Sequence, residues 1–390
     1  MAIDEPNLFL TRGSAVAAVR SRVRAADGHF APAVRKLEAE AADVITAGPW
    51  SVIDKKGAAP SGDPHDFVGL SAYWWPNPDR ADGLPYVPRD GVVNPEQELY
   101  DGPAIRTMAD AFGKLAAHAY FCGSVQSGER AAVVLERWFI DPETRMNPHL
   151  EYGGYTPGIW NGTGWGIVGT HVLVGLLEAV ALLVAAGHLS PTSHDGFLRW
   201  IEAYLEWLLH SDHGRFEADR PNNHGTAYDC QVMMMAYHLG REGVARQVAE
   251  QVAYRRIGIQ LEHNGQQPWE VARTKSWGYS SGNLLLLMHL ADMGVRLGVD
   301  LWGYETGDGR SLRRSFDYML PAALGRQEWP WQVIGGWSGA GEIWLEILRR
   351  AAGGFGDRGL DQMATELDGL STDQVAANRI QLTCPAPGMS

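Results

Sequence analysis

The sequence predicts an all-α protein in which helical hairpins form an incomplete (α/α) toroid, with long loops lining a groove. Three observations predict this class. Apolar residues recur with the helical period of about 3.6 residues almost throughout the 390-residue chain. No segment shows the sustained alternation of a half-buried strand, and no βαβ succession occurs. Around ten amphipathic helices joined by loops rich in Gly, Trp and Pro fit hairpins stacked in a ring. A repeat solenoid is the alternative, but no fixed motif period is present.

The expected helices follow from this periodicity in chain order. Two helices, at 15–26 and 33–47, are separated around Gly28 and Pro32. Further helices are expected at 104–123, 129–140, 168–187 and 194–211, after His224, and at 243–261, 282–298, 309–324 and 341–354.

The helical segments follow one another without a low-complexity linker, so residues 1–390 are expected to form a single domain. The stretch 48–102 is irregular and rich in Gly, Pro, Asp and Trp. Loops longer than about 15 residues are uncommon without a function, so this segment is expected to be a lid or one wall of a substrate groove. Residues 354–390 are expected to form a tail with a short helix and an extended end.

Charge and composition exclude several classes of protein. The formal net charge of −13 argues against non-specific binding of nucleic acid or of an acidic membrane. The three cysteines have no CxxC spacing, which argues against a disulfide framework. The most apolar run, 172–187, contains Glu178 and is shorter than a membrane span. The first residues show no signal-peptide pattern, so a soluble chain is expected. Neither localisation nor oligomeric state is indicated.

Tryptophan is unusually frequent, with 15 residues. Several lie beside Tyr, Pro or Gly in irregular segments, as in SAYWWPNP (71–78), GIWNGTGWG (158–166) and EWPWQVIGGW (328–337). Indole rings suit stacking on the flat apolar faces of pyranose rings. Binding of carbohydrate and simple packing of long loops are both compatible with these clusters.

The segment RPNNHGTAYDCQ (220–231) places two amides and an imidazole where a helix is expected to begin. One asparagine, Asn222 or Asn223, is explained as an N-cap. A cap leaves the second asparagine and His224 unexplained. The free N–H groups and dipole of a first helical turn also favour a bound carboxylate. A functional site is therefore favoured over a cap alone. Tyr228 lies on the apolar face expected for this helix.

A second stretch contains Arg273, Lys275 and Tyr279, and a helix is expected to begin after Ser280 or Ser281. One interpretation is a solvated basic loop with packed aromatic residues. The other is a cationic pocket around a phenol. Nearby cations would lower the phenol's pKa from its reference value of about 10 and make the tyrosine a usable base.

Six segments in this order resemble the alginate-lyase-type polysaccharide lyases, and are most similar to the branch that includes glucuronan- and alginate-cleaving enzymes. The resemblance spans roughly residues 65 to 305. It rests on YWWPNP, DGLPYVPRDGVVNPE, DPETRMNPHLEY, NNHGTAYDCQ, QPWEVARTKSWGYSSGNL and GVDLW. It implies an (α/α) toroid and cleavage of a β-1,4-linked uronate polymer by β-elimination, leaving 4,5-unsaturated uronate ends.

The resemblance also implies roles for individual residues. Asn223, with help from Arg273, would neutralise the substrate carboxylate. His224 would assist, or act as base for the opposite C5 configuration, and Tyr279 would be both base and acid. These types suit the chemistry, because removal of the C5 proton builds negative charge beside a carboxylate and the leaving O4 needs a proton. Substrate-binding roles are expected for Tyr73, Trp74, Trp75, Asn222, Tyr228 and Lys275. The chemistry requires no metal or cofactor.

Two departures from the better-known alginate lyases leave the substrate open between alginate and glucuronan. The interval from Arg273 to Tyr279 is one residue shorter, and Gly225-Thr226-Ala227 replaces Ser-Tyr-Trp after the NNH motif. The expected partner is an anionic polysaccharide, not a nucleic acid or membrane. Two alternatives remain at this stage. A glycoside hydrolase on the same toroid would need two carboxylates flanking the bond. A glycan-binding protein without catalysis would need neither His224 nor Tyr279.

Overall fold

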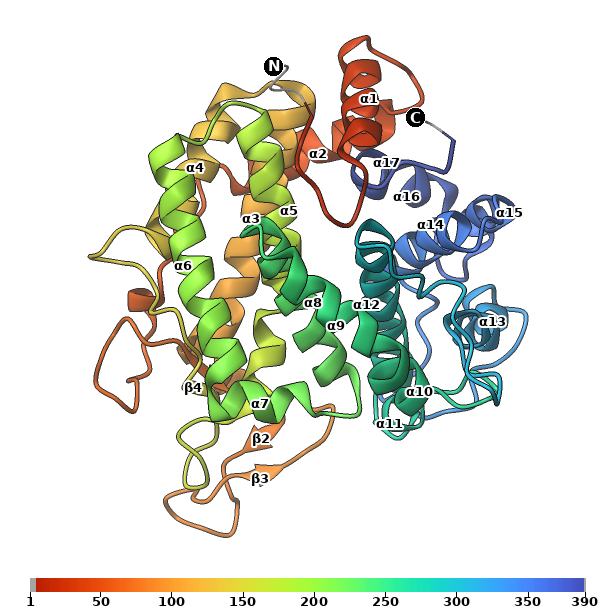
Figure 1. Cartoon of the computed structure of the whole chain (residues 1–390). Coiled ribbons are helices and arrows are strands. Elements are labelled where there is room, and N and C mark those ends of the chain that lie inside the picture. The colour runs from red at the N-terminus through yellow and green to blue at the C-terminus, as the bar shows by residue number, and fades with distance from the viewer. Residues whose placement is uncertain (1–4, 389–390) are drawn as a thin grey trace.

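A computed structural model describes residues 5–388, and helices dominate it (Figure 1). The α-helices are α1 (Gly13–Arg24), α2 (Ala31–Val44), α3 (Asp101–Cys122), α4 (Val125–Phe139), α5 (Val172–Ala185), α6 (Pro191–His210), α7 (Asp212–Ala218), α8 (Asn223–His238), α9 (Glu242–Val252), α10 (Gly258–Gln260), α11 (Pro268–Val271), α12 (Ser276–Arg296), α13 (Leu312–Ala323), α14 (Ile343–Gly354), α15 (Gly359–Gln362), α16 (Thr372–Ala377) and α17 (Ile380–Thr383). Short 3-10 or π turns are η1 (Val52–Asp54), η2 (Pro95–Leu99), η3 (Gly164–Thr170), η4 (Ala253–Ile257) and η5 (Met363–Glu366). The prediction of an all-α protein is confirmed.

Five long helices form an arc in which each contacts the next: α3 with α5, α5 with α8, α8 with α12, and α12 with α14. Figure 1 shows α3, α5 and α8 in one group and α12 and α14 in another. Helices α4, α6 and α9 pack on the arc, where α4 contacts α3 and both α6 and α9 contact α8. This arrangement agrees with the expected incomplete toroid of helical hairpins.

Helix α8 differs from the amphipathic helix expected after His224. Every residue from 225 to 236 is buried, because α5, α6, α7, α9 and α12 all contact this helix. Its polar side chains have internal partners: Asp229 pairs with the buried Arg256 at 2.7 Å, and Thr226 donates to Gln260 at 2.9 Å. A helix enclosed on all sides needs no polar face, so the expectation of one apolar face was wrong.

The irregular segment 48–102 contains short strands that the sequence did not indicate. Strand β1 (Val68–Leu70) pairs in parallel with β4 (Tyr152–Tyr155), and β2 (Trp74–Trp75) pairs antiparallel with β3 (Val87–Pro88). Two to four residues are too few to show a period of two. The β2–β3 hairpin lies at the lower edge of the molecule in Figure 1.

Residues 354–390 were expected to form a short helix with an extended end, and the described part of this tail is more helical than that. Residues beyond 354 form α15, η5, α16 and α17, and Leu360, Leu367 and Leu382 are buried. Helix α16 contacts α2, and α17 contacts α1, so the end of the chain packs against its beginning.

Among the described residues, one helical stretch, Gly164–Ala185, is long and apolar enough to cross a membrane by length and composition alone. Most residues in the apolar part of this stretch are buried inside the protein, as in the core helices of globular proteins. Its acidic residue, Glu178, accepts hydrogen bonds from the main chain of Phe9 and Leu10.

Candidate active site

Helix α12 begins at Ser276, not after Ser280 or Ser281 as expected. Both later serines are buried inside the helix, and the Ser281 hydroxyl accepts a hydrogen bond from the Trp344 indole at 3.0 Å. Tyr279 therefore lies in the first turn of a 21-residue helix rather than in a loop. A helix restricts the phenol more closely than a loop would, as a catalytic group requires.

Tyr279 lies at the centre of a polar cluster. Its hydroxyl donates to the Tyr73 hydroxyl at 3.0 Å and accepts from Arg273 Nη2 at 3.0 Å. The guanidinium also lies over the Tyr279 ring, 4.1 Å from its centroid. Arg273 pairs in turn with Asp90 at 2.5 Å, and Asp90 also accepts from Thr274. Tyr73 and Asp90 both come from the segment 48–102, so this segment forms part of the site wall.

Asp90 was not recognised from the sequence, because nothing local distinguishes it from other loop aspartates. Its hydrogen bond with Arg273 is the main reason that its pKa is lowered to about 2. The carboxylate is therefore ionised at neutral pH and holds the guanidinium against the Tyr279 ring.

The direction expected for the pKa of Tyr279 was wrong. Burial and the hydrogen bond with Tyr73 raise the pKa of Tyr279 well above its ordinary value of 10. The charge of Arg273 acts in the opposite direction, as expected, but is the smaller effect. The phenol therefore keeps its proton at neutral pH in the free protein, ready to act as an acid. A second group must accept that proton before the oxygen can act as a base.

The start of α8 brings His224 against a carboxylate that the sequence analysis missed. His224 Nδ1 lies 2.7 Å from Oε1 of Glu217, which is fully buried on α7. A carboxylate oxygen accepts this hydrogen bond and Nδ1 donates it, so Nε2 is the ring nitrogen left for another partner. Glu217 stands seven residues before His224, and only the fold of α7 against α8 shows the pairing.

Glu270 links the two halves of the site. Its Oε1 accepts the main-chain N–H of Asn223 at 2.7 Å, and the charges of His224 and Arg273 both act on it. The residue is 1% exposed, and burial is the main reason that its pKa is raised to about 7. Glu270 Oε2 and Asn223 Oδ1 are both buried without a protein partner among the described residues. A carboxyl group that is partly neutral repels a substrate carboxylate less than a fully charged one.

The raised pKa of Glu270 predicts a pH-dependent stability effect. The folded value of about 7 exceeds the ordinary 4.5, so between these pH values the unfolded chain loses a proton that the folded protein keeps. Folding stability is therefore lost as pH rises through this window, by about 3 kcal/mol at roughly 1.4 kcal/mol per pKa unit. Glu270→Gln keeps an Oε1 acceptor for Asn223 and removes the titration. We expect its Tm, relative to wild type, to be higher at pH 8 than at pH 4.

Differential scanning calorimetry at both pH values measures this difference. Glu250→Gln, at an exposed position of α9, makes the same chemical change on the surface and should shift Tm equally at the two pH values. Equal shifts for Glu270→Gln as well would contradict a raised pKa.

The other residues predicted to bind substrate differ in their burial and in their contacts. Trp74 and Trp75 are half-buried, and the Trp75 indole donates to the main chain of Val92. Lys275 Nζ lies 5.8 Å from the Tyr73 ring centroid, just before α12. Asn222 occupies the N-cap position of α8, but its side chain accepts no capping hydrogen bond.

The substrate-binding role predicted for Tyr228 is contradicted by its position. Its ring is buried in the core, and its hydroxyl donates to the main-chain carbonyl of Leu208 at 3.0 Å. The residue stabilises the packing of α8 on α6 instead.

A row of aromatic residues continues from Trp74. No substrate-binding role was predicted from the sequence for the other members of this row. Ring centroids are 5.5 Å apart between Trp74 and Trp160, 5.5 Å between Trp160 and Trp165, and 5.9 Å between Trp165 and Phe216. Trp160, Trp165 and Phe216 are exposed. Exposed rings beside a polar cluster suit stacking on sugar faces.

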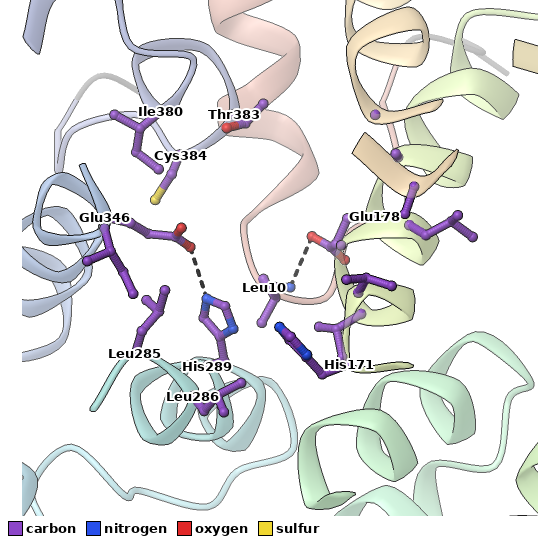
Figure 2. Close-up of a pocket in the computed structure, with 18 of the residues that line it drawn as sticks. Leu10, His171, Glu178, Leu285, Leu286, His289, Glu346, Ile380, Thr383 and Cys384 are labelled. Atoms are coloured by element: carbon purple, nitrogen blue, oxygen red, sulfur yellow. Dashed lines mark hydrogen bonds and ion pairs between the residues drawn. The ribbon is translucent and has the colours of Figure 1, made fainter. Parts of the chain in front are cut away.

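Asn223 and Tyr279 line one cavity of about 600 Å³, which continues into the helical arc between α5 and α12 (Figure 2). Among residues 5–388 one group of three side chains could hold a metal: Glu38, His118 and Cys122. None of the three lines this cavity. The site therefore offers amide, imidazole, guanidinium and phenol groups for handling a carboxylate and moving a proton.

A helical arc with an amide and a phenol lining its cavity, and a guanidinium bonded to that phenol, belongs to an enzyme of the polysaccharide lyase class. The chain belongs to the alginate lyase family, whose model, described as "Alginate lyase", matches residues 51–329. The structure of an alginate lyase from Bacteroides ovatus is 32% identical, covers 97% of this chain and 99% of its own, and has a TM-score of 0.91.

More distant structures share the fold. Alginate lyase A1-III from Sphingomonas species A1 is 13% identical over 89% of this chain and 96% of its own, with a TM-score of 0.52. A complex of alginate lyase A1-III with a tetrasaccharide is 14% identical over 88% of this chain and 94% of its own, with a TM-score of 0.54. No curated protein sequence matches the chain significantly.

Proposed function

We propose that this lyase cleaves the β-1,4 linkages of alginate by β-elimination at the cavity that Asn223 and Tyr279 share. The observation that carries the proposal is the convergence of Arg273 and Tyr73 on the Tyr279 hydroxyl beside that cavity. The Bacteroides ovatus protein, similar over nearly the whole chain, is an alginate lyase, which favours alginate over glucuronan.

The substrate carboxylate must be neutralised before the adjacent C5 proton can be removed. The Asn223 side chain lines the cavity, and its Oδ1 makes no internal hydrogen bond. The amide Nδ2 is the atom that donates to the carboxylate, because Oδ1 is itself an acceptor. The Arg273 guanidinium adds positive charge from the other side of the site. Charge stabilisation of this kind is the largest contribution that the protein makes to such a reaction.

Proton transfer then involves His224 and Tyr279. We assign to His224 Nε2 the role of accepting the phenolic proton as substrate binds. This transfer leaves a phenolate beside Arg273 and an imidazolium beside Glu217. The phenolate takes the C5 proton, and the electron pair of the C5–H bond forms the C4–C5 double bond as the C4–O4 bond breaks. Tyr279 gives its new proton to O4, and the imidazolium proton returns to the phenolate. In mannuronate and glucuronate the C5 proton and O4 lie on one face, within reach of one phenol.

Spectrophotometry of the purified protein with alginate, glucuronan and hyaluronan tests the proposal. We expect growth of the ultraviolet band of a 4,5-unsaturated uronate with alginate. Growth with glucuronan alone would overturn the choice of substrate but not the elimination. New reducing ends without the band would mean hydrolysis, and binding without either would indicate a glycan-binding protein.

A further inference from the structure

The cavity at Tyr279 extends well beyond the reacting groups. Its walls come from α3, α5, α12 and α14. Figure 2 shows the rings of His171 and His289 turned toward one another across it. His289 Nε2 is bonded to Glu346 at 2.9 Å, while Nδ1 has no partner in the described part of the chain. A volume of about 600 Å³ lies within the range of roughly 300–1,000 Å³ that small-molecule sites occupy.

A segment from the beginning of the chain, residues 8–11, called here the N-terminal strap, lines part of the cavity, together with Val16 on α1 and with Ile380 and Thr383 on α17. Glu178 on α5 accepts the main-chain N–H groups of Phe9 at 2.7 Å and Leu10 at 3.3 Å. Arg350 on α14 donates to the Leu10 carbonyl at 3.2 Å, and Arg296 on α12 donates to that of Thr11 at 3.3 Å. The strap is thus hydrogen-bonded to α5 in one group of helices and to α12 and α14 in the other.

The strap and the β2–β3 hairpin, which carries Trp74 and Trp75, lie on opposite sides of the molecule (Figure 1). Figure 1 shows the N-terminal segment passing between the two groups of helices, far from β2 and β3 in this view. The side chains of Leu8 and Leu10 line the cavity, and Phe9 stacks on Tyr237 with centroids 3.9 Å apart. These contacts hold the strap in place as a fixed wall.

Three glycines on the inner helices leave the cavity wide. A Cβ added to Gly175 on α5, or to Gly278 or Gly282 on α12, would meet no atom within 4 Å. Glycine inside a helix costs about 1 kcal/mol relative to alanine. Neighbouring protein atoms do not require glycine at these positions, whereas a bulky ligand in the cavity would.

We infer that the N-terminal strap is the end wall of the substrate groove, so that only a short oligosaccharide fits between it and Tyr279. The inference rests on the proposed function. Sugars on this side of the cleaved bond are confined, while the rest of the polymer extends past the hairpin. The enzyme therefore cuts near a chain end and releases short products whose length the strap limits.

Three variants test this inference with alginate as substrate. Gly175→Leu fills the middle of the cavity and should shift products toward shorter oligosaccharides. Leu10→Ala shortens the wall and should shift them toward longer ones. Gly243→Leu, an exposed position of α9 whose added Cβ also meets no atom within 4 Å, is the matched control and should leave them unchanged. Mass spectrometry gives product lengths, and circular dichroism confirms that each variant folds.

Viscometry of the unmodified protein provides a test that needs no variant. Cleavage near chain ends should lower viscosity slowly relative to growth of the unsaturated-uronate band. A steep early loss of viscosity, or product lengths that stay the same in Gly175→Leu and Leu10→Ala, would overturn the inference and leave the proposed function standing. Absence of the band with every polymer would instead reject the proposed function.

Discussion

Replacing Tyr279 with phenylalanine is expected to abolish formation of unsaturated uronate while leaving polymer binding nearly unchanged. The phenol oxygen is the only atom lost, and it is the atom on which Arg273 and Tyr73 converge. Positioned acid–base groups contribute about 10²- to 10⁴-fold, and here one oxygen serves both proton transfers, so a loss in kcat at the upper end of that range is expected. Initial rates from the ultraviolet band and affinity from calorimetry measure the two effects separately.

Tyr73→Phe is the matched control for this prediction. It removes the hydroxyl that accepts the Tyr279 hydrogen bond but leaves the proton carrier itself in place. We expect a clearly smaller loss in kcat than with Tyr279→Phe. Near-full activity of Tyr279→Phe would show that another residue moves the proton.

The second large effect is expected from Asn223→Ala. This variant removes the amide that faces the cavity, yet keeps the main-chain N–H that bonds Glu270, so the start of α8 should be retained. Loss of one donor to a developing anion costs about 10²- to 10³-fold in kcat. We expect a loss of this size, measured as the initial rate of band formation with saturating alginate.

The neighbouring amide provides the comparison. Asn222→Ala makes the same change one residue earlier, where the side chain does not line the cavity and the main-chain carbonyl bonds Gln260. A much smaller loss is expected. Equal losses in the two variants would mean that Asn223 acts through the local structure of the helix start and not through the substrate carboxylate.

Most of the helices were predictable because their pattern is local. Helix α6 was expected at 194–211 and occupies Pro191–His210, and α14 was expected at 341–354 and occupies Ile343–Gly354. Helices α7 and α11, with seven and four residues, are too short to show two turns of periodicity and were missed. The start of α12 was misplaced because Ser280 and Ser281 are good capping residues that the fold instead buries in the helix.

The sequence by itself determined which chemical groups were available: the NNH motif, Arg273 and Tyr279, in an order typical of polysaccharide lyases. Helical periodicity and residue type are properties of neighbouring positions, so they can be recognised without the fold. The pairing of Asp90 with Arg273 joins residues 183 positions apart, and that of Glu270 with Asn223 joins residues 47 apart.

Only the tertiary structure decided how these groups behave. Burial, which depends on every element packed around a side chain, raises the pKa of Tyr279 against the pull of Arg273. It likewise brings the pKa of Glu270 to about 7. The N-terminal strap contacts helices that follow it by about 170 to 340 residues. Desolvation and long-range contact come from the folded arrangement. Neither the raised pKa of the phenol nor the position of the strap could therefore be inferred from the order of residues.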